Sequence, residues 1–214
     1  MEFSYFFIFL SFILSMSLGT LYTGIGSYIK NNNRTDGKII FSWNMLLWVV
    51  IMIFVVLQYF IGIYQLYGHD LVDPSDMFFC ILNVIVVSLI FIICKLLTPD
   101  FNAPDVVKRI KKDGVYSLGE YFNRNRRALA SSAILLIILN ALNYFVINDV
   151  APITYVRERL GFHLPLIVFL YLSGFRIKAG KYYWRTQNGI ALVFLILILA
   201  MLIDVMNKAS QIQS

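Results

Sequence analysis

The segment Met77–Leu97 constrains the fold of this chain more than any other feature, because Lys95 is its only charged residue. A helix needs about 20 apolar residues to cross a hydrocarbon core of about 30 Å, so this segment can span a bilayer. Composition extends the argument to the whole chain, since 59% of its residues are hydrophobic and only 14% are charged. Soluble domains carry about 25% charged residues. The sequence therefore excludes a soluble domain and predicts an all-α transmembrane helix bundle.

Six segments of the chain are candidates for membrane spans. Five of them meet the length requirement, at residues 3–29, 39–67, 77–97, 128–148 and 182–206. The remaining segment, the fifth in chain order, lies between Arg159 and Arg176 and contains Pro165. As a helix it is about 24 Å long at about 1.5 Å per residue, so it either crosses a thinned bilayer or forms a re-entrant segment. Six spans are expected, in two three-helix units (1–97 and 128–214) joined by a loop at 98–127.

The basic residues favour one side of this arrangement. Alternating loops place all but three of the 18 Lys and Arg residues on one face, the exceptions being Arg157, Arg159 and Lys208. The positive-inside rule makes the basic face cytoplasmic and leaves both termini outside. The N-terminus has neither a basic n-region nor a cleavage-site pattern, so the first segment is expected to be a retained helix.

Residues 98–127 form the one substantial loop between the predicted spans. Val106, Val107 and Ile110 share one face of a short helical pattern that ends at Gly114, and the bases around them are typical of a helix at the membrane surface. We predict that this amphipathic cytoplasmic loop binds anionic lipid headgroups or a protein partner, with ordinary positive-inside anchoring as the alternative. Its basic residues are Lys108, Arg109, Lys111, Lys112, Arg124, Arg126 and Arg127. The net charge of +6 is assigned to such loops, so no nucleic-acid partner is predicted.

Small residues recur at every fourth position of the first segment, at Ser11, Ser15, Gly19 and Thr23. In lipid, helix association depends on close packing, and a stripe of small side chains permits a close approach. We predict that these four residues form a helix-packing face. Its partner is either another helix of the chain or a second copy in a homo-oligomer.

Polar residues inside the predicted spans form a second candidate site. With the topology above, they fall at one depth in the outer half of the bilayer: Gln58, Asn83, Asn140, Asn143 and His163. Two interpretations remain open. The residues either line a polar pocket that receives a small solute or form hydrogen bonds between helices.

The sequence carries no catalytic or metal-binding pattern. No Asp or Glu lies in the middle of a predicted span, which disfavours ion-coupled transport. Cys80 and Cys94 share one apolar run without a CxxC motif, so both are expected to be free thiols. The acidic loop at 69–76 lacks a recognised ligand spacing. No catalytic residue, metal site or cofactor is predicted, and the chain is not expected to be an enzyme.

Three short motifs resemble a known group of proteins. They are Trp43-Asn44-Met45-Leu46-Leu47-Trp48, Gln58-Tyr59-Phe60 and Glu120-Tyr121-Phe122-Asn123-Arg124-Asn125-Arg126-Arg127. Together with the first segment they resemble a widespread family of uncharacterised six-span proteins of bacterial inner membranes. In that family a histidine stands at the position of Asn44, and a Trp pair replaces Phe60 and Ile61. The resemblance implies a bacterial inner-membrane location and six spans, and it implies no activity.

These features favour a structural, interaction or sensing component of a membrane complex. The alternative is a small-solute channel or facilitator that uses the polar cluster. The sequence identifies neither a solute nor a protein partner. Membrane lipids are the one ligand class that its charge pattern indicates.

Overall fold

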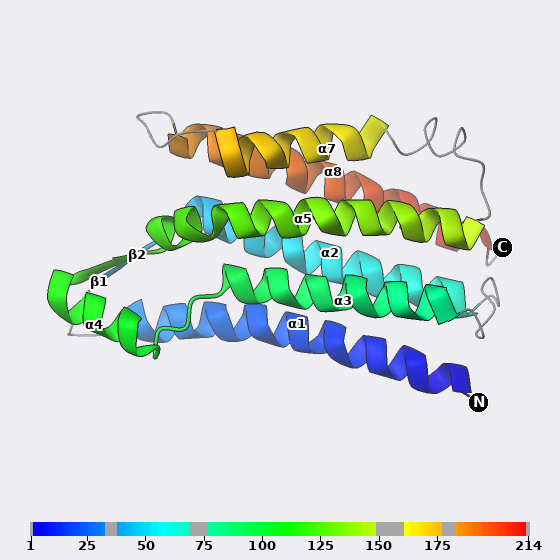
Figure 1. Ribbon diagram of the computed structural model, residues 1–214, viewed down its shortest axis with the longest axis horizontal. Coiled ribbons are helices and arrows are strands. Elements are labelled where there is room, and N and C mark those ends of the chain that lie inside the picture. The colour runs from blue at the N-terminus through cyan, green and yellow to red at the C-terminus, as the bar shows by residue number, and fades with distance from the viewer. Residues whose placement is uncertain (1, 33–37, 69–76, 149–160, 177–182, 213–214) are drawn as a thin grey trace.

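The structure is a computed structural model, and it describes residues 2–32, 38–68, 77–148, 161–176 and 183–212. Long helices dominate it (Figure 1), which confirms the all-helical prediction. They are α1 (Glu2–Asn32), α2 (Trp43–Gly68), α3 (Met77–Leu97), α5 (Leu118–Asn148), α7 (Gly161–Tyr171) with its π-helical continuation η2 (Leu172–Arg176), and α8 (Tyr183–Ile212). The short elements are β1 (Lys38–Ile40), α4 (Pro104–Asp113) and β2 (Val115–Ser117).

Within the described residues, four helices are long and apolar enough to cross a membrane, as expected for a membrane protein. These candidate spans are Tyr5–Asn32, Trp43–Ile63, Met77–Leu97 and Leu118–Asn143. Shorter apolar stretches follow at His163–Phe175 in α7 and η2 and at Arg185–Ala200 in α8. Large apolar side chains such as Phe12 and Ile196 are exposed on the outside of the bundle, where lipid rather than water is the fitting solvent.

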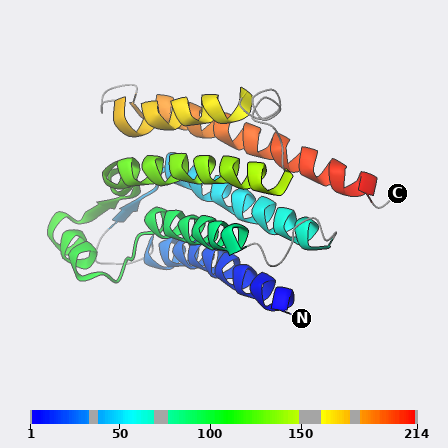
Figure 2. The same ribbon diagram turned by 45° about the vertical axis from the view of Figure 1, so that its right-hand side comes forward.

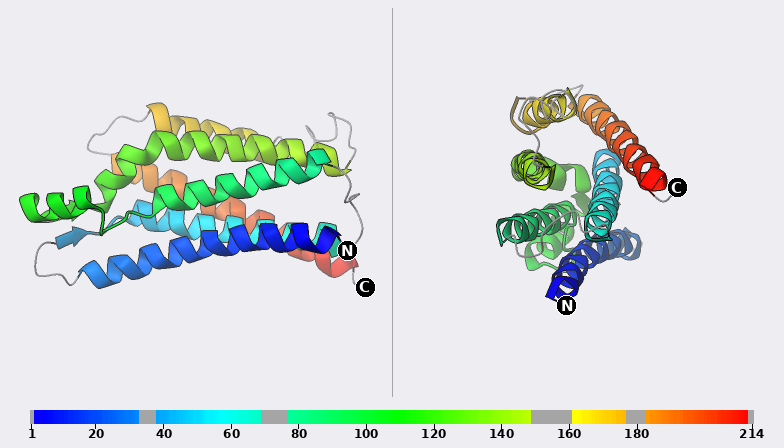
Figure 3. Two further views of the ribbon diagram at one scale, coloured as in Figure 1. Left: turned by 60° about the horizontal axis from the view of Figure 1, so that its bottom comes forward. Right: turned by 90° about the vertical axis from the view of Figure 1, so that its right-hand side faces the viewer.

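The long helices lie side by side in two layers, seen end-on in Figure 3. One layer contains α1, α2 and α8, and the other contains α3, α5 and α7. The layers share a core of aliphatic side chains that includes Leu14, Val56 and Ile90. The short elements lie together at one end of the bundle, whereas α1 begins and α8 ends at the opposite end (Figure 1).

The short elements form a small folded unit, which we call the cap (residues 38–40 and 99–117). Strand β1 pairs with β2 in parallel, with Ile39 opposite Tyr116, and the two strands lie side by side in Figure 2. The backbone turns from α4 into β2 at Gly114, whose φ of 66° favours glycine. The cap has a core of its own, made of Ile39, Phe101, Val106, Ile110 and Tyr116, to which Leu118 at the start of α5 contributes.

The cap changes the interpretation of the amphipathic helix. Residues 104–113 are helical as predicted, but Val106 and Ile110 are buried inside the cap and do not form an apolar face toward lipid. Only Val107, of the three apolar residues on the predicted face, remains partly exposed. The protein supplies the apolar partners of these two residues from β1, β2 and Phe101, so this part of the expected interfacial face is directed into the cap.

Hydropathy located some helix ends correctly and others incorrectly. Helix α3 has the predicted bounds, whereas α2 begins at Trp43 and not at residue 39. Ser42 caps α2: its carbonyl accepts the N–H of Leu46 at 3.1 Å, and its hydroxyl accepts that of Met45 at 3.5 Å. Helix α5 begins at Leu118, so the end of the expected loop at 98–127 is helical.

Candidate functional site

The structure brings together two of the five residues of the predicted polar cluster. Asn83 of α3 and Asn143 of α5 exchange side-chain hydrogen bonds: the Asn143 amide donates to Asn83 Oδ1 at 3.1 Å, and the Asn83 amide donates to Asn143 Oδ1 at 3.4 Å. Asn83 Oδ1 also accepts the hydroxyl proton of Tyr59 from α2. The Asn83 amide donates once more, to the carbonyl of Phe79 at 2.9 Å. We call Tyr59, Asn83 and Asn143 the asparagine clasp.

The asparagine clasp is buried and closed. Asn83 is 1% exposed and Asn143 is 6% exposed. Asn83 makes two bonds through its oxygen and two through its nitrogen, which uses the full capacity of a side-chain amide. In a membrane protein, hydrogen bonds between helices contribute about 0.6 kcal/mol each on average. The arrangement joins α2, α3 and α5 and leaves Asn83 no free group for a solute.

The other members of the predicted cluster are placed differently. Gln58 and Asn140 are half-buried, and within the described ranges neither is hydrogen-bonded to Asn83 or Asn143. His163 is buried near the start of α7. Tyr59 completes the clasp and was not predicted, because the predicted cluster contains only amide and imidazole groups within the spans. Its position next to Gln58 was the available signal.

A second buried polar contact, which was not predicted, joins α8 to η2. The hydroxyl of Ser173 donates to Oε1 of Gln187 at 2.5 Å, and Nε2 of Gln187 donates to the carbonyl of Ser173 at 3.1 Å. Next to this contact, a Cβ on Gly174 would overlap the Cβ of Ala130 in α5. The π-helical turn thus lies where α7, α5 and α8 meet.

The small-residue stripe of α1 lies on the outside of the bundle. Ser11 is half-buried, whereas Ser15, Gly19 and Thr23 are exposed. A Cβ on Gly19 would meet no atom within 4 Å. By contrast, a Cβ on Gly24 would lie 2.5 Å from Cγ2 of Thr98, which shows that α1 approaches the rest of the chain through a different face.

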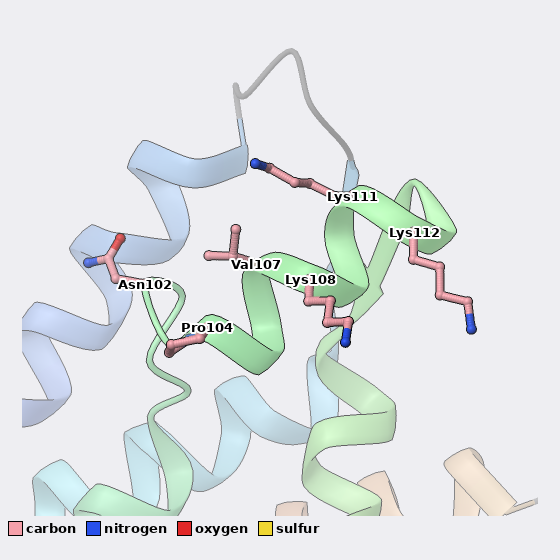
Figure 4. A pocket seen from close by; sticks show the side chains of 6 residues that line it. All are labelled: Asn102, Pro104, Val107, Lys108, Lys111 and Lys112. Atoms are coloured by element: carbon pink, nitrogen blue, oxygen red, sulfur yellow. The ribbon is translucent and has the colours of Figure 1, made fainter.

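The basic residues of the predicted loop fall on two elements. Lys108, Lys111 and Lys112 are exposed on α4 and, with Asn102, Pro104 and Val107, line an open surface depression of about 580 Å³ (Figure 4). The side chain of Arg109 lies outside the described part of the structure. Arg124, Arg126 and Arg127 belong to the first turns of α5, where Arg126 is half-buried and the other two are exposed.

Among the described residues, no group of three or more His, Cys, Asp or Glu side chains is arranged to hold a metal ion. The acidic loop at 69–76 lies outside the described residues. Cys80 and Cys94 are free thiols, half-buried and buried respectively.

Comparison of the chain with protein-family models, with curated proteins and with solved structures yields no match. The function must therefore be argued from the geometry of the chain itself.

Proposed function

We propose that this protein is a structural or sensing component of a membrane complex and that it assembles through the outer face of α1. The observation that carries the proposal is the exposure of Ser15, Gly19 and Thr23 on that face. Small residues on a transmembrane helix are enriched where another helix approaches closely, and here no helix of the described chain occupies the stripe. The occupant is then a second copy of the chain or a helix of another membrane protein.

The proposed setting is a bacterial cytoplasmic membrane that the chain crosses six times. Helix α1 begins and helix α8 ends at the end of the bundle that lies away from the cap (Figure 1). This placement suits an even number of crossings. Most basic residues belong to the cap end, and the positive-inside rule then assigns the cap to the cytoplasm and both termini to the outside. Helix α7 with η2 is about 24 Å long at about 1.5 Å per residue, so its crossing requires local thinning of the bilayer.

In this arrangement the cap contacts the anionic headgroups of the inner leaflet. Its buried core fixes α4, so that Lys108, Lys111 and Lys112 stay on the surface. Each basic residue near an anionic membrane surface contributes about 1 kcal/mol of attraction, and the effect decays within the Debye length. The exposed aromatic pair of Phe41 and Trp43, with ring centroids 5.2 Å apart, lies beside the cap and suits the same interfacial depth.

The structure gives less support to the alternative function, a solute facilitator. That function would need polar groups free to bind a passing solute, and Asn83 has used all of its hydrogen-bonding capacity within the asparagine clasp. The bonds of Asn143 are directed to Asn83. The clasp is better suited to holding three helices together.

The proposal is tested by native mass spectrometry of the protein in lipid nanodiscs. We expect the wild type to form a discrete oligomer or a stoichiometric complex and the variant Gly19→Ile to lose it, since the added side chain blocks a close approach. The monomer has room for that side chain, because no atom lies within 4 Å of a Cβ at Gly19. Gly189→Ile is the matched control, since Gly189 of α8 is equally open, and it should assemble normally. A monomeric wild type without a partner, or a Gly19→Ile variant that still assembles, would contradict the proposal.

A further inference from the structure

Two buried polar side chains on α2 have hydrogen-bonding groups that no described residue satisfies. Asn44 is 1% exposed, and Trp48, one helical turn later, is 7% exposed. Within the described part of the chain, Oδ1 and Nδ2 of Asn44 and Nε1 of Trp48 all lack a partner. Buried polar groups are normally hydrogen-bonded, because a buried group without a partner loses the hydrogen bonds that it made to water. A ligand at this position would restore them.

Aromatic rings from two other helices pack against Trp48. The indole ring of Trp48 lies 5.5 Å from the ring of Phe194 in α8 and 6.4 Å from that of Phe122 in α5, measured between centroids. Helix α2 also packs extensively along α8, and both helices begin at the cap end of the bundle (Figure 1). The near-complete burial of Asn44 admits only a very small ligand.

The chemistry of the unsatisfied groups specifies the ligand. The side-chain oxygen of Asn44 is an acceptor and requires a donor. The Asn44 amide nitrogen and the Trp48 indole nitrogen are donors and require acceptors. None of these groups is charged, so nothing in the set favours an ion over a neutral molecule. A water molecule donates two hydrogen bonds and accepts two, and it is small enough for a buried position.

We propose that Asn44 and Trp48 bind buried water at the junction of α2, α5 and α8. The site lies in the first two turns of α2, next to the cap and away from the asparagine clasp. Its water supplies hydrogen bonds that the three helices do not supply to one another. This role is independent of the assembly proposed for α1.

Radiolytic footprinting of the full chain in nanodiscs tests the site, because X-ray pulses generate hydroxyl radicals from bound water inside a protein. Mass spectrometry then measures the oxidation of each tryptophan. We expect Trp48 to be oxidised at a rate comparable with that of Trp43, although Trp43 is 67% exposed and Trp48 only 7%. In H₂¹⁸O, the oxidation product of Trp48 should carry the heavy isotope. A wild-type Trp48 that stays unlabelled would overturn the proposal.

A pair of asparagine variants makes the test specific. Asn44→Leu should lower the labelling of Trp48 several-fold, whereas Asn143→Leu, which removes another buried amide, should leave it unchanged. Unchanged labelling of Trp48 in Asn44→Leu would overturn the proposal. An organic molecule that is bound to the wild type and missing from Asn44→Leu would also overturn it. If Asn44→Leu does not fold, the ratio of Trp48 to Trp43 labelling in the wild type decides the question by itself.

Discussion

Replacing Asn83 by leucine distinguishes a structural clasp from a solute-binding residue. Asn83 makes three hydrogen bonds to other helices, one with Tyr59 and two with Asn143. At about 0.6 kcal/mol for each such bond, Asn83→Leu should lower the free energy of unfolding by about 2 kcal/mol. Asn143→Leu removes two of the three bonds and should cost about 1 kcal/mol.

The double variant gives the sharper result. Asn83→Leu with Asn143→Leu removes the same three bonds as Asn83→Leu alone, so its cost should stay near about 2 kcal/mol instead of the additive value of about 3 kcal/mol. The expected coupling energy is thus about 1 kcal/mol. The measurement is reversible unfolding in mixed micelles with an increasing fraction of denaturing detergent, followed by circular dichroism.

Asn140→Leu is the control, because Asn140 lies one turn from Asn143 and makes no hydrogen bond to the clasp within the described residues. It should change the unfolding free energy by less than about 0.5 kcal/mol. Strictly additive losses of unfolding free energy in Asn83→Leu and Asn143→Leu would refute the clasp. A loss in Asn140→Leu as large as that in Asn143→Leu would refute it as well. Liposome flux gives an independent check: solute entry that requires Asn140 and Asn143 would instead favour the facilitator.

Two further predictions concern close packing and charge. Gly174→Val should destabilise the protein by about 1 to 3 kcal/mol, because its side chain would overlap Ala130, whereas Gly62→Val, at an open position, should be nearly neutral in the same unfolding assay. Replacing the three exposed lysines of α4 by glutamine should reduce the retention of anionic over neutral lipids, measured by native mass spectrometry. The wild-type preference should itself weaken between about 0.1 M and about 1 M salt, and a preference that survives both changes would contradict the role of the cap.

The sequence predicted the helical class well because hydropathy reports burial in lipid directly. Helix α3 is the clearest case, since its apolar run is bounded by polar residues and its bounds were predicted correctly. Helix α5 shows the limit of the method. Its first turns contain Arg124 and Arg127, and a helix can continue through such polar residues into the interface while the hydropathy signal ends earlier.

The cap could not be predicted from local patterns. Each strand has three residues, and Ile39 pairs with Tyr116, a partner far along the chain. Short strands of this kind are stabilised by tertiary contacts, so their own sequence carries little signal. For the same reason, Val106 and Ile110 could not be assigned to a protein core instead of a lipid surface.

The candidate sites were predicted in part. Asn83 and Asn143 were identified because amides are rare inside apolar spans, but the choice between a pocket and a clasp depended on which groups their atoms meet. Gln187 lies in a polar stretch beside Arg185 and Asn188, so its burial had no comparable signal in the sequence. The outward direction of Gly19 depends on how α1 packs against α3, which the spacing of small residues does not specify.

The parallel pairing of β1 with β2 also imposes an order on biosynthesis. One strand precedes α2 and the other follows α3, so the sheet cannot close until the ribosome has synthesised both of these helices. Helix α5 then starts directly after β2 and is held beside the start of α2 from its first residue. Domains generally fold from the N-terminal side during synthesis. Helices α1 to α5 and the cap would therefore already be in place when α7 packs against α5 and α8 packs against α2 during translation.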